Sequence, residues 1–251
     1  MKIKLNSETY TGVAGSSLSD TRCLQTLDLY LFVKSHNDLT YREVRSETVK
    51  AGLYKSESVL RTFCPLLREL GYIITESNTP MSFTSDGELF AHIIAAIEEA
   101  KCIEDDDIKT TVLSKLEKAK SHAIQLGIMN MNQSDDDVCK NHNIWLVLYL
   151  LDNLDYFDWN EYWLALKVFI EDKYTLQDFK TQIAQNRQKG VRYEACNREN
   201  GQQLADTTFT YIKALLKEAN LIEDVPNGSR LTSEGKEFVK KSPYGIYKAK
   251  H

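Results

Sequence analysis

Apolar residues recur at helical spacing in two stretches of the chain. In residues 59–70 they are Val59, Leu60, Phe63, Leu66, Leu67 and Leu70, and in residues 209–219 they are Phe209, Ile212, Leu215, Leu216 and Ala219. This spacing predicts an amphipathic helix in each stretch. Gly71 and Asn220 follow directly, and both residue types tolerate the left-handed backbone that ends a helix. We therefore expect both helices to stop at the same point of one pattern.

The two stretches belong to an internal repeat. Residues 66–73 (LLRELGYI) match residues 215–222 (LLKEANLI), and residues 83–90 (FTSDGELF) match residues 231–238 (LTSEGKEF). The offset is 149 residues in the first block (215 − 66) and 148 in the second (231 − 83), so one residue is lost between the blocks.

Short β-prone runs lie between the two blocks of each copy. Residues 72–75 and 81–84 flank a polar turn, and residues 221–225 and 229–232 flank a turn with an Asn-Gly pair, which together predict two hairpins. A closing helix follows each hairpin. Ser85 begins a sequence with capping-box spacing, and Ser233 supplies the cap without the acidic partner.

Further helical patterns complete the two copies. Those ahead of the first hairpin are residues 23–34, residues 41–50 and a third helix starting at residues 56–58; those ahead of the second are residues 143–154, residues 159–171 and a helix starting at Thr175. Residues 185–205 form a polar insertion, residues 106–125 a helical connector, and residues 130–141 a polar loop. We expect a mainly α protein with small β-hairpins, divided into residues 1–103, 104–142 and 143–251.

Charge is distributed unevenly along the 251 residues. The net charge of −5 argues mildly against a nucleic-acid partner, because phosphate contacts need Lys and Arg. Between Lys180 and Lys217, however, seven basic residues oppose three acidic ones, a local surplus of four. No apolar run approaches the roughly 20 residues of a membrane span, and the N-terminal residues lack a signal-peptide core, so we expect a cytoplasmic protein.

Motifs for metals, cofactors and catalysis are missing from the sequence. The five cysteines and five histidines are scattered without a Cys-x-x-Cys pair, which predicts reduced structural thiols and no metal site. Phosphate-loop, nucleophile-elbow and zinc-protease signatures are absent, so no cofactor is expected. Two sets have the bare Asp…Glu-x-Lys spacing of a restriction nuclease, although helical context argues against both: Asp155 with Glu171 and Lys173, and Asp224 with Glu234 and Lys236.

The repeated pattern of a helix ending Leu-Leu-(Arg/Lys)-Glu, a hairpin and then Thr-Ser-(Asp/Glu)-Gly resembles the winged helix-turn-helix superfamily. The resemblance covers two stretches of about 60 to 80 residues. Tandem copies with a long insertion also resemble the DNA-recognition regions of type IIS restriction endonucleases. This likeness implies that the third helix of a copy enters the major groove while the wing touches the neighbouring backbone or minor groove.

The resemblance places candidate DNA-binding side chains on the third helix of each copy, in the insertion and on the second wing. They are Ser56, Ser58, Arg61, Thr62, Arg68, Arg187, Lys189, Arg192, Asn197, Arg198, Gln202, Gln203, Thr207, Thr208, Thr210, Lys213, Asn227 and Arg230. Guanidinium, amide and hydroxyl groups are the chemistry that reads base edges and phosphates. Helix caps and solvated charges are the structural alternative for the same residues.

These residues predict sequence-specific binding of double-stranded DNA at an asymmetric site, with the insertion-bearing second copy dominant. Such a chain would be the recognition part of a restriction-modification system, with a nuclease domain or subunit elsewhere and no catalytic site of its own. A transcriptional regulator and a winged-helix protein-interaction module are the alternatives. The oligomeric state does not follow from the residues.

Overall fold

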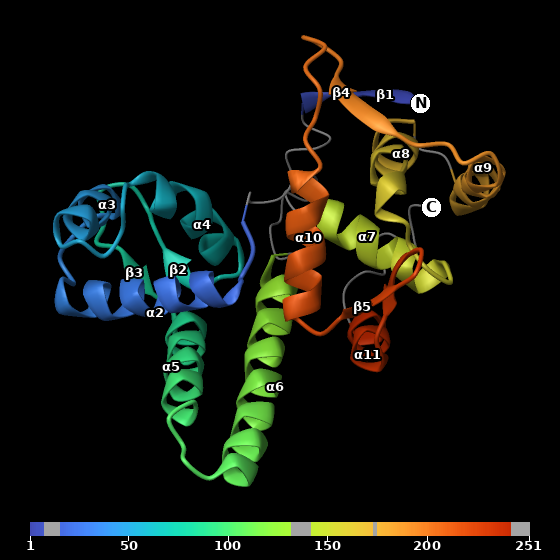
Figure 1. The fold of residues 1–251 in the computed structure, drawn as a ribbon. Helices are drawn as coiled ribbons and strands as arrows, with labels where there is room; N and C mark the ends of the chain where they lie inside the picture. The colour runs from blue at the N-terminus through green and yellow to red at the C-terminus, as the bar shows by residue number, and fades with distance from the viewer. Residues whose placement is uncertain (8–15, 132–141, 173–174, 242–251) are drawn as a thin grey trace. The chain divides into compact units, whose positions relative to one another are not determined.

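The computed structural model describes residues 1–7, 16–131, 142–172 and 175–241, and its fold is mainly helical with two-stranded sheets (Figure 1). No helix among these residues has the length and apolarity needed to cross a membrane. The chain divides into two compact units. The inserted unit is Ala14–Gln133, and the discontinuous unit joins Met1–Val13 to Ser134–His251. This division differs from the predicted boundaries after residues 103 and 142.

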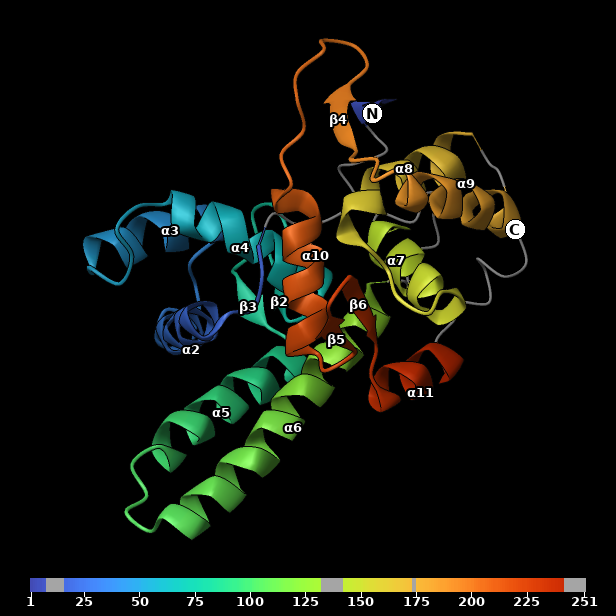
Figure 2. The ribbon, with the colours of Figure 1, turned by 45° about the vertical axis from the view of Figure 1, so that its right-hand side comes forward.

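The inserted unit consists of helices around one small hairpin. In chain order its elements are α2 (Asp20–Ser35), α3 (Tyr41–Lys50), α4 (Ser58–Glu69), β2 (Ile73–Ile74), β3 (Ser82–Phe83), α5 (Ser85–Ala100) and α6 (Asp106–Asn130). The predicted helices 23–34 and 41–50 and the first hairpin are confirmed. Helices α5 and α6 lie side by side as an antiparallel pair (Figures 1 and 2).

Helix α6 packs within the inserted unit, whereas the sequence predicts a connector between two units. The helix continues past residue 125 to Asn130. Gly127 lets it approach the end of α4 closely, because a Cβ there would lie 2.8 Å from a methyl carbon of Leu70. The Tyr72 hydroxyl also donates a hydrogen bond to the Ala123 carbonyl at 2.9 Å. The predicted loop 130–141 lies, apart from residues 130 and 131, outside the described residues.

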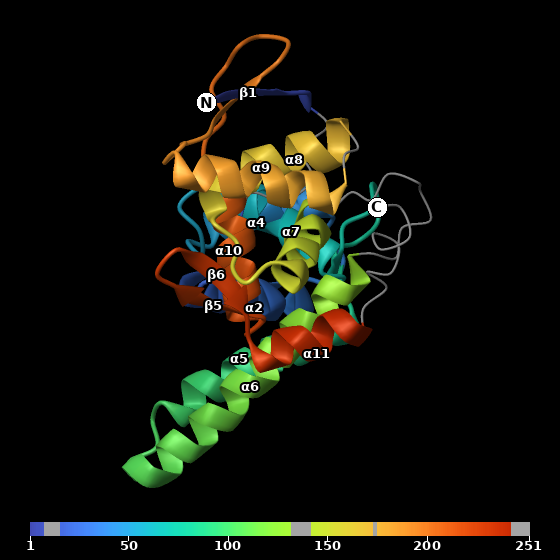
Figure 3. The same ribbon diagram turned by 90° about the vertical axis from the view of Figure 1, so that its right-hand side faces the viewer.

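The discontinuous unit carries the second copy of the repeat. Its elements are β1 (Lys2–Leu5), α7 (His142–Asn153), η1 (Trp159–Glu161), α8 (Tyr162–Leu166), η2 (Lys167–Glu171), α9 (Leu176–Gln188), β4 (Glu194–Asn197), α10 (Thr207–Glu218), β5 (Ile222–Val225), β6 (Gly228–Leu231) and α11 (Ser233–Lys241). The predicted helix 159–171 is a succession of a 3₁₀ turn, an α-helical turn and a π-helical turn. The second hairpin, β5 with β6, is confirmed and lies next to α11 (Figure 3).

The polar insertion contains an element that the sequence pattern does not predict. Strand β4 pairs in parallel with β1, with Lys2 opposite Glu194 and Leu5 opposite Asn197 (Figure 1). Ile3 and Leu5 are buried, so alternate residues of β1 face the core.

Both units add a third stretch of backbone to the hairpin. In the inserted unit Thr40, between α2 and α3, pairs with Pro80. In the discontinuous unit Phe157, between α7 and η1, pairs with Ser229 through two hydrogen bonds of 2.8 and 3.0 Å. The repeat therefore extends to a backbone pairing that the matched sequence blocks do not include.

In the inserted unit, the end of α4, the helix before the hairpin, makes a close contact with the start of α5, the closing helix after it. Gly71 has a φ of 76°, which turns the chain after α4. The Thr84 hydroxyl donates to the Gly71 carbonyl at 2.6 Å and accepts the Gly87 amide at 3.1 Å. A Cβ on Gly87 would lie 2.0 Å from the Tyr72 carbonyl oxygen, so only glycine fits there.

The discontinuous unit repeats this contact residue by residue. Asn220 has a φ of 54°, and the Thr232 hydroxyl donates to its carbonyl at 2.6 Å while accepting the Gly235 amide at 2.9 Å. A Cβ on Gly235 would lie 2.1 Å from the Leu221 carbonyl oxygen. We call this arrangement of left-handed stop, threonine and glycine the helix clasp.

The clasp corrects the predicted helix caps. The sequence pattern assigns the caps of the closing helices to Ser85 and Ser233, but the capping hydroxyls belong to Thr84 and Thr232, one residue earlier. Each threonine also bonds the preceding helix stop and so ties both ends together. Ser85 and Ser233 lie inside the first turn, where a side chain would not make both bonds.

We expect Gly235→Ala to lower the free energy of unfolding by about 1–3 kcal/mol, because the added methyl collides with backbone rather than with a flexible side chain. Thermal and urea unfolding followed by circular dichroism measure the effect. Lys236→Ala, at the next and exposed position of the same helix, is the control and should change stability by less than about 0.5 kcal/mol. Equal losses in the two variants would show that the close contact with the Leu221 carbonyl oxygen is not what requires glycine at position 235.

Candidate nucleic-acid interface

Helix α4 presents a polar face opposite its buried side. Leu60, Phe63, Leu66 and Leu67 are buried, whereas Ser58, Arg61, Thr62 and Arg68 are exposed. Neither Arg61 nor Arg68 takes part in an ion pair with another described residue. Both guanidinium groups therefore remain available to an external anion.

The hydroxyl groups predicted for this interface are engaged within the chain. The Ser56 and Ser58 hydroxyls are 2.6 Å apart and share one hydrogen bond. The Thr62 hydroxyl donates to the carbonyls of Ser58, at 3.1 Å, and Val59, at 2.8 Å. Their oxygens can still accept hydrogen bonds, but these hydroxyls are less available to donate to a ligand than the two arginine side chains are.

Helix α3 adds two cations that are not among the predicted DNA-binding residues. Arg42 is exposed and pairs with no carboxylate in the described part of the chain, and Arg45 lies 3.6 Å from Glu57 with its guanidinium 5.2 Å from the centre of the Tyr41 ring. Burial raises the pKa of Tyr41 to about 12, and the positive charges of Arg45 and Arg68 oppose that rise. The spacing of three between Arg42 and Arg45, on one side of a helix, was the available signal.

Helix α10, the counterpart of α4, has its two lysines paired with one carboxylate of the hairpin. Lys213 and Lys217 both contact the Asp224 carboxylate, at 2.9 and 2.6 Å. Thr207 and Thr210 are exposed, and the Thr210 hydroxyl donates to the Asp206 carbonyl at 2.9 Å. The side chain of Thr208 lies outside what the structure describes.

The second hairpin pairs its own charges as well. Arg230 lies opposite Glu223 in the β5–β6 register, and their side chains form an ion pair at 2.7 Å. Asn227 is exposed in the turn between these strands, and its side chain bonds no other described residue. Of the two predicted wing residues, Asn227 is thus available to a ligand, while Arg230 is already matched by a carboxylate.

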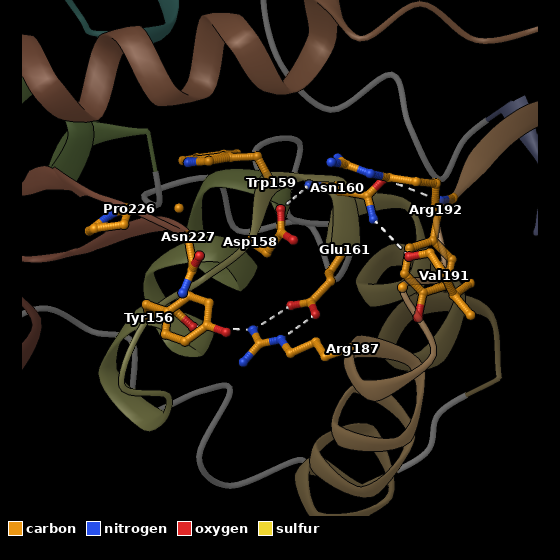
Figure 4. Close-up of a pocket in the computed structure, with 13 residues that line it drawn as sticks. Tyr156, Asp158, Trp159, Asn160, Glu161, Arg187, Val191, Arg192, Pro226 and Asn227 are labelled. Atoms are coloured by element: carbon orange, nitrogen blue, oxygen red, sulfur yellow. Dashed lines mark hydrogen bonds and ion pairs between the residues drawn. The ribbon is translucent and has the colours of Figure 1, made fainter.

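Arg187, predicted to reach a DNA groove, is instead half-buried against its own unit. Its guanidinium donates to both oxygens of the Glu161 carboxylate, at 2.6 and 2.8 Å, and stacks 4.1 Å from the centre of the Tyr156 ring (Figure 4). The Glu161 side chain is 2% exposed. Burial raises the pKa of this carboxyl, and the facing guanidinium opposes the rise.

The remaining insertion residues divide between structural and exposed positions. Arg198 pairs with Glu171 at 2.5 Å, and Asn197 is buried and accepts the amides of Glu199 and Asn200. The side chains of Lys189, Arg192, Gln202 and Gln203 are exposed and make no hydrogen bond or ion pair with another described residue. The insertion therefore supplies fewer available cations than its sequence indicated.

Carboxylates of the two sets with nuclease-like spacing make structural contacts within the chain. Glu171 accepts the Asn6 amide at 2.6 Å and pairs with Lys167 and Arg198, and Asp224 is held by its two lysines. Glu234 accepts the Asn220 amide group at 2.6 Å, and Lys173 lies outside the described residues. Within the described ranges, no group of three or more His, Cys, Asp or Glu side chains could hold a metal ion.

Comparison with protein-family models, with curated proteins and with solved structures found no significant match for this chain. Its function is therefore inferred from its own residues and their geometry.

We expect Arg187→Ala to reduce the free energy of unfolding by about 3 kcal/mol, because it leaves the buried Glu161 carboxylate without its partner. Urea unfolding measures this loss. Lys189→Ala, at an exposed position two residues away, is the matched control and should change stability by less than about 0.5 kcal/mol. A stable Arg187→Ala protein would contradict the structural role of this pair.

Asp224 gives a test of the α10 charge network. Hydrogen bonds from Lys217 and Lys213 lower the pKa of its carboxyl to about 2. A lowered pKa means that the carboxylate stabilises the fold above the unfolded-state value of about 3.9 and that this contribution is lost as pH falls towards 2. Carboxyl NMR titration should show the low pKa, and Lys217→Gln should raise it. A titration near the ordinary value would show that the lysines do not hold this group.

Proposed function

We propose that the chain binds double-stranded DNA through tandem winged-helix units, with α4 of the inserted unit as the helix that enters the major groove. The observation that carries this proposal is the exposed pair Arg61 and Arg68, which no carboxylate among the described residues neutralises. Arg42, on the preceding helix, is a further exposed arginine without a carboxylate partner among the described residues. Arginine reads guanine edges with two hydrogen bonds and binds phosphate in the same manner.

The helix clasp supports the winged-helix interpretation. It fixes where the third helix stops and where the closing helix begins in both units. A hairpin held in this way next to the third helix is the arrangement by which a wing reaches the backbone beside an occupied groove.

This proposal assigns the main DNA contact to the first copy rather than to the insertion-bearing second copy. In the second copy, both lysines of α10 form ion pairs with Asp224, and Arg230 forms one with Glu223. Releasing these cations to phosphate would leave carboxylates unpaired near the backbone of the DNA, which is unfavourable.

Recognition within a restriction-modification system is our preferred setting. Two units with different surface charges suit an asymmetric DNA site, whereas a transcriptional regulator that reads palindromic half-sites is usually a symmetric dimer. In that setting a nuclease domain or subunit would supply the cleavage chemistry.

A protein-binding role is the second candidate, and the ion-paired face of α10 and its hairpin favours it for the discontinuous unit. Paired charges form a poor phosphate ligand but are compatible with a polar protein interface.

Selection of bound fragments from a random duplex library at two salt concentrations tests the proposal. We expect an asymmetric enriched sequence. Substituting both Arg61 and Arg68 with Ala should weaken binding at least tenfold and reduce the salt slope by about one for each phosphate that is no longer neutralised.

Lys101→Ala is the control, because this lysine already pairs with Glu98 at the turn between α5 and α6. It should bind DNA as the unaltered chain does. No duplex binding at low salt would refute the DNA-binding proposal and favour a protein partner. Equal binding by the double variant would refute the assignment of the DNA contact to α4.

A further inference from the structure

A polar cavity of about 470 Å³ opens in the discontinuous unit, beside the turn of the second hairpin (Figure 4). Three segments line it: residues 156 and 158–161 after α7, Arg187 with residues 190–193 at and after the end of α9, and the hairpin turn 226–228. Its size falls within the range of about 300–1,000 Å³ that small-molecule sites occupy. None of the DNA contacts proposed for α4 uses it.

An ion pair between Glu161 and Arg187 forms part of the cavity lining. The Glu161–Arg187 pair holds the segment after α7 against α9, and the Arg187 guanidinium lies over the Tyr156 ring. A buried ion pair of this kind often adds no more stability than apolar side chains of the same volume would. Its flat, partly exposed guanidinium is also a surface on which a planar ring can stack.

The cavity wall is held in place by one amide side chain. Asn160 accepts the Tyr193 amide at 3.1 Å and donates to the Val191 carbonyl at 3.5 Å. These bonds fix the backbone on both sides of Arg192, which is exposed and lines the cavity. The Arg192 side chain therefore extends from a backbone that these hydrogen bonds hold in place.

Polar groups available to a ligand line this space. One carboxylate oxygen of Asp158 accepts a hydrogen bond from the backbone N–H of Asn160 at 2.9 Å, which leaves the second oxygen free to accept one from a ligand. The side chains of Arg192 and Asn227 make no hydrogen bond or ion pair with the described residues. The site thus combines the Asp158 carboxylate as an acceptor, the Asn227 amide as both donor and acceptor, the Arg192 cation and the flat guanidinium of Arg187.

We propose that this cavity binds a nucleotide. The base stacks on the Arg187 guanidinium, the Asp158 and Asn227 side chains bond its edge, and Arg192 binds its phosphate. Carboxylate and amide groups match the donor and acceptor pattern of base edges, and guanidinium groups match phosphate. The nucleotide is either a free molecule or a residue displaced from a DNA duplex, since both present the same chemistry.

Calorimetric titration of the full chain with the four deoxynucleoside 5′-monophosphates tests the site. We expect saturable binding of at least one of them, with one site per chain. Arg192→Gln and Asn227→Ala should each weaken it at least about tenfold, the effect of one good base or phosphate contact. Lys189→Gln removes a nearby cation that does not line the cavity and should bind normally. All three positions are exposed, so the fold should be retained.

A second titration identifies the source of the nucleotide. A preference for a duplex with one unpaired nucleotide over the fully paired duplex, abolished by Arg192→Gln, assigns the cavity to a displaced base; binding of mononucleotides without that preference assigns it to a free nucleotide. No mononucleotide binding up to about 1 mM together with no such preference overturns the proposal, as does equal binding by Arg192→Gln and Asn227→Ala. Because Arg61 and Arg68 do not line the cavity, substituting them leaves the mononucleotide result unchanged, and the two proposals can fail separately.

Discussion

The helix clasp is the constraint on which both units depend. In each copy, a closing helix approaches the residue after a left-handed stop so closely that only a glycine fits against its carbonyl oxygen. One threonine hydroxyl bonds both the stop and the start of the closing helix. The direction in which the hairpin leaves the third helix is set by this contact. The Thr-Ser-(Asp/Glu)-Gly blocks of the two copies are therefore explained by geometry rather than by any ligand.

The same scaffold carries two different electrostatic surfaces. On α4 the arginines have no carboxylate partner among the described residues, whereas on α10 the lysines converge on Asp224. Because the clasp holds the hairpin beside α10, a single acidic residue on β5 forms ion pairs with lysines on two successive turns of that helix. A difference in charge on a shared backbone arrangement is a simple way to give the two units different partners.

Helical periodicity and turn residues predicted the local elements well, because these signals depend on neighbours a few positions apart. The helix 41–50 and both hairpins follow from such patterns. Contacts between distant residues left no comparable signal. Strand β1 is four residues long and pairs with a strand about 190 positions away, and Arg187 meets a carboxylate 26 residues earlier. A basic side chain in a polar segment gives no indication that its partner is buried, so the insertion looked more available to DNA than it is.

The pairing of β1 with β4 has a consequence for how the protein forms. The discontinuous unit encloses the whole of Ala14–Gln133 within its own chain path. During synthesis the inserted unit emerges complete before most of the other unit exists, so it can fold before β1 has a neighbour to pair with. A folded insert also shortens the effective loop that must close to bring β1 to β4, which lowers the entropic cost of that late pairing. We therefore expect the inserted unit to fold first and the discontinuous unit to complete its fold afterwards.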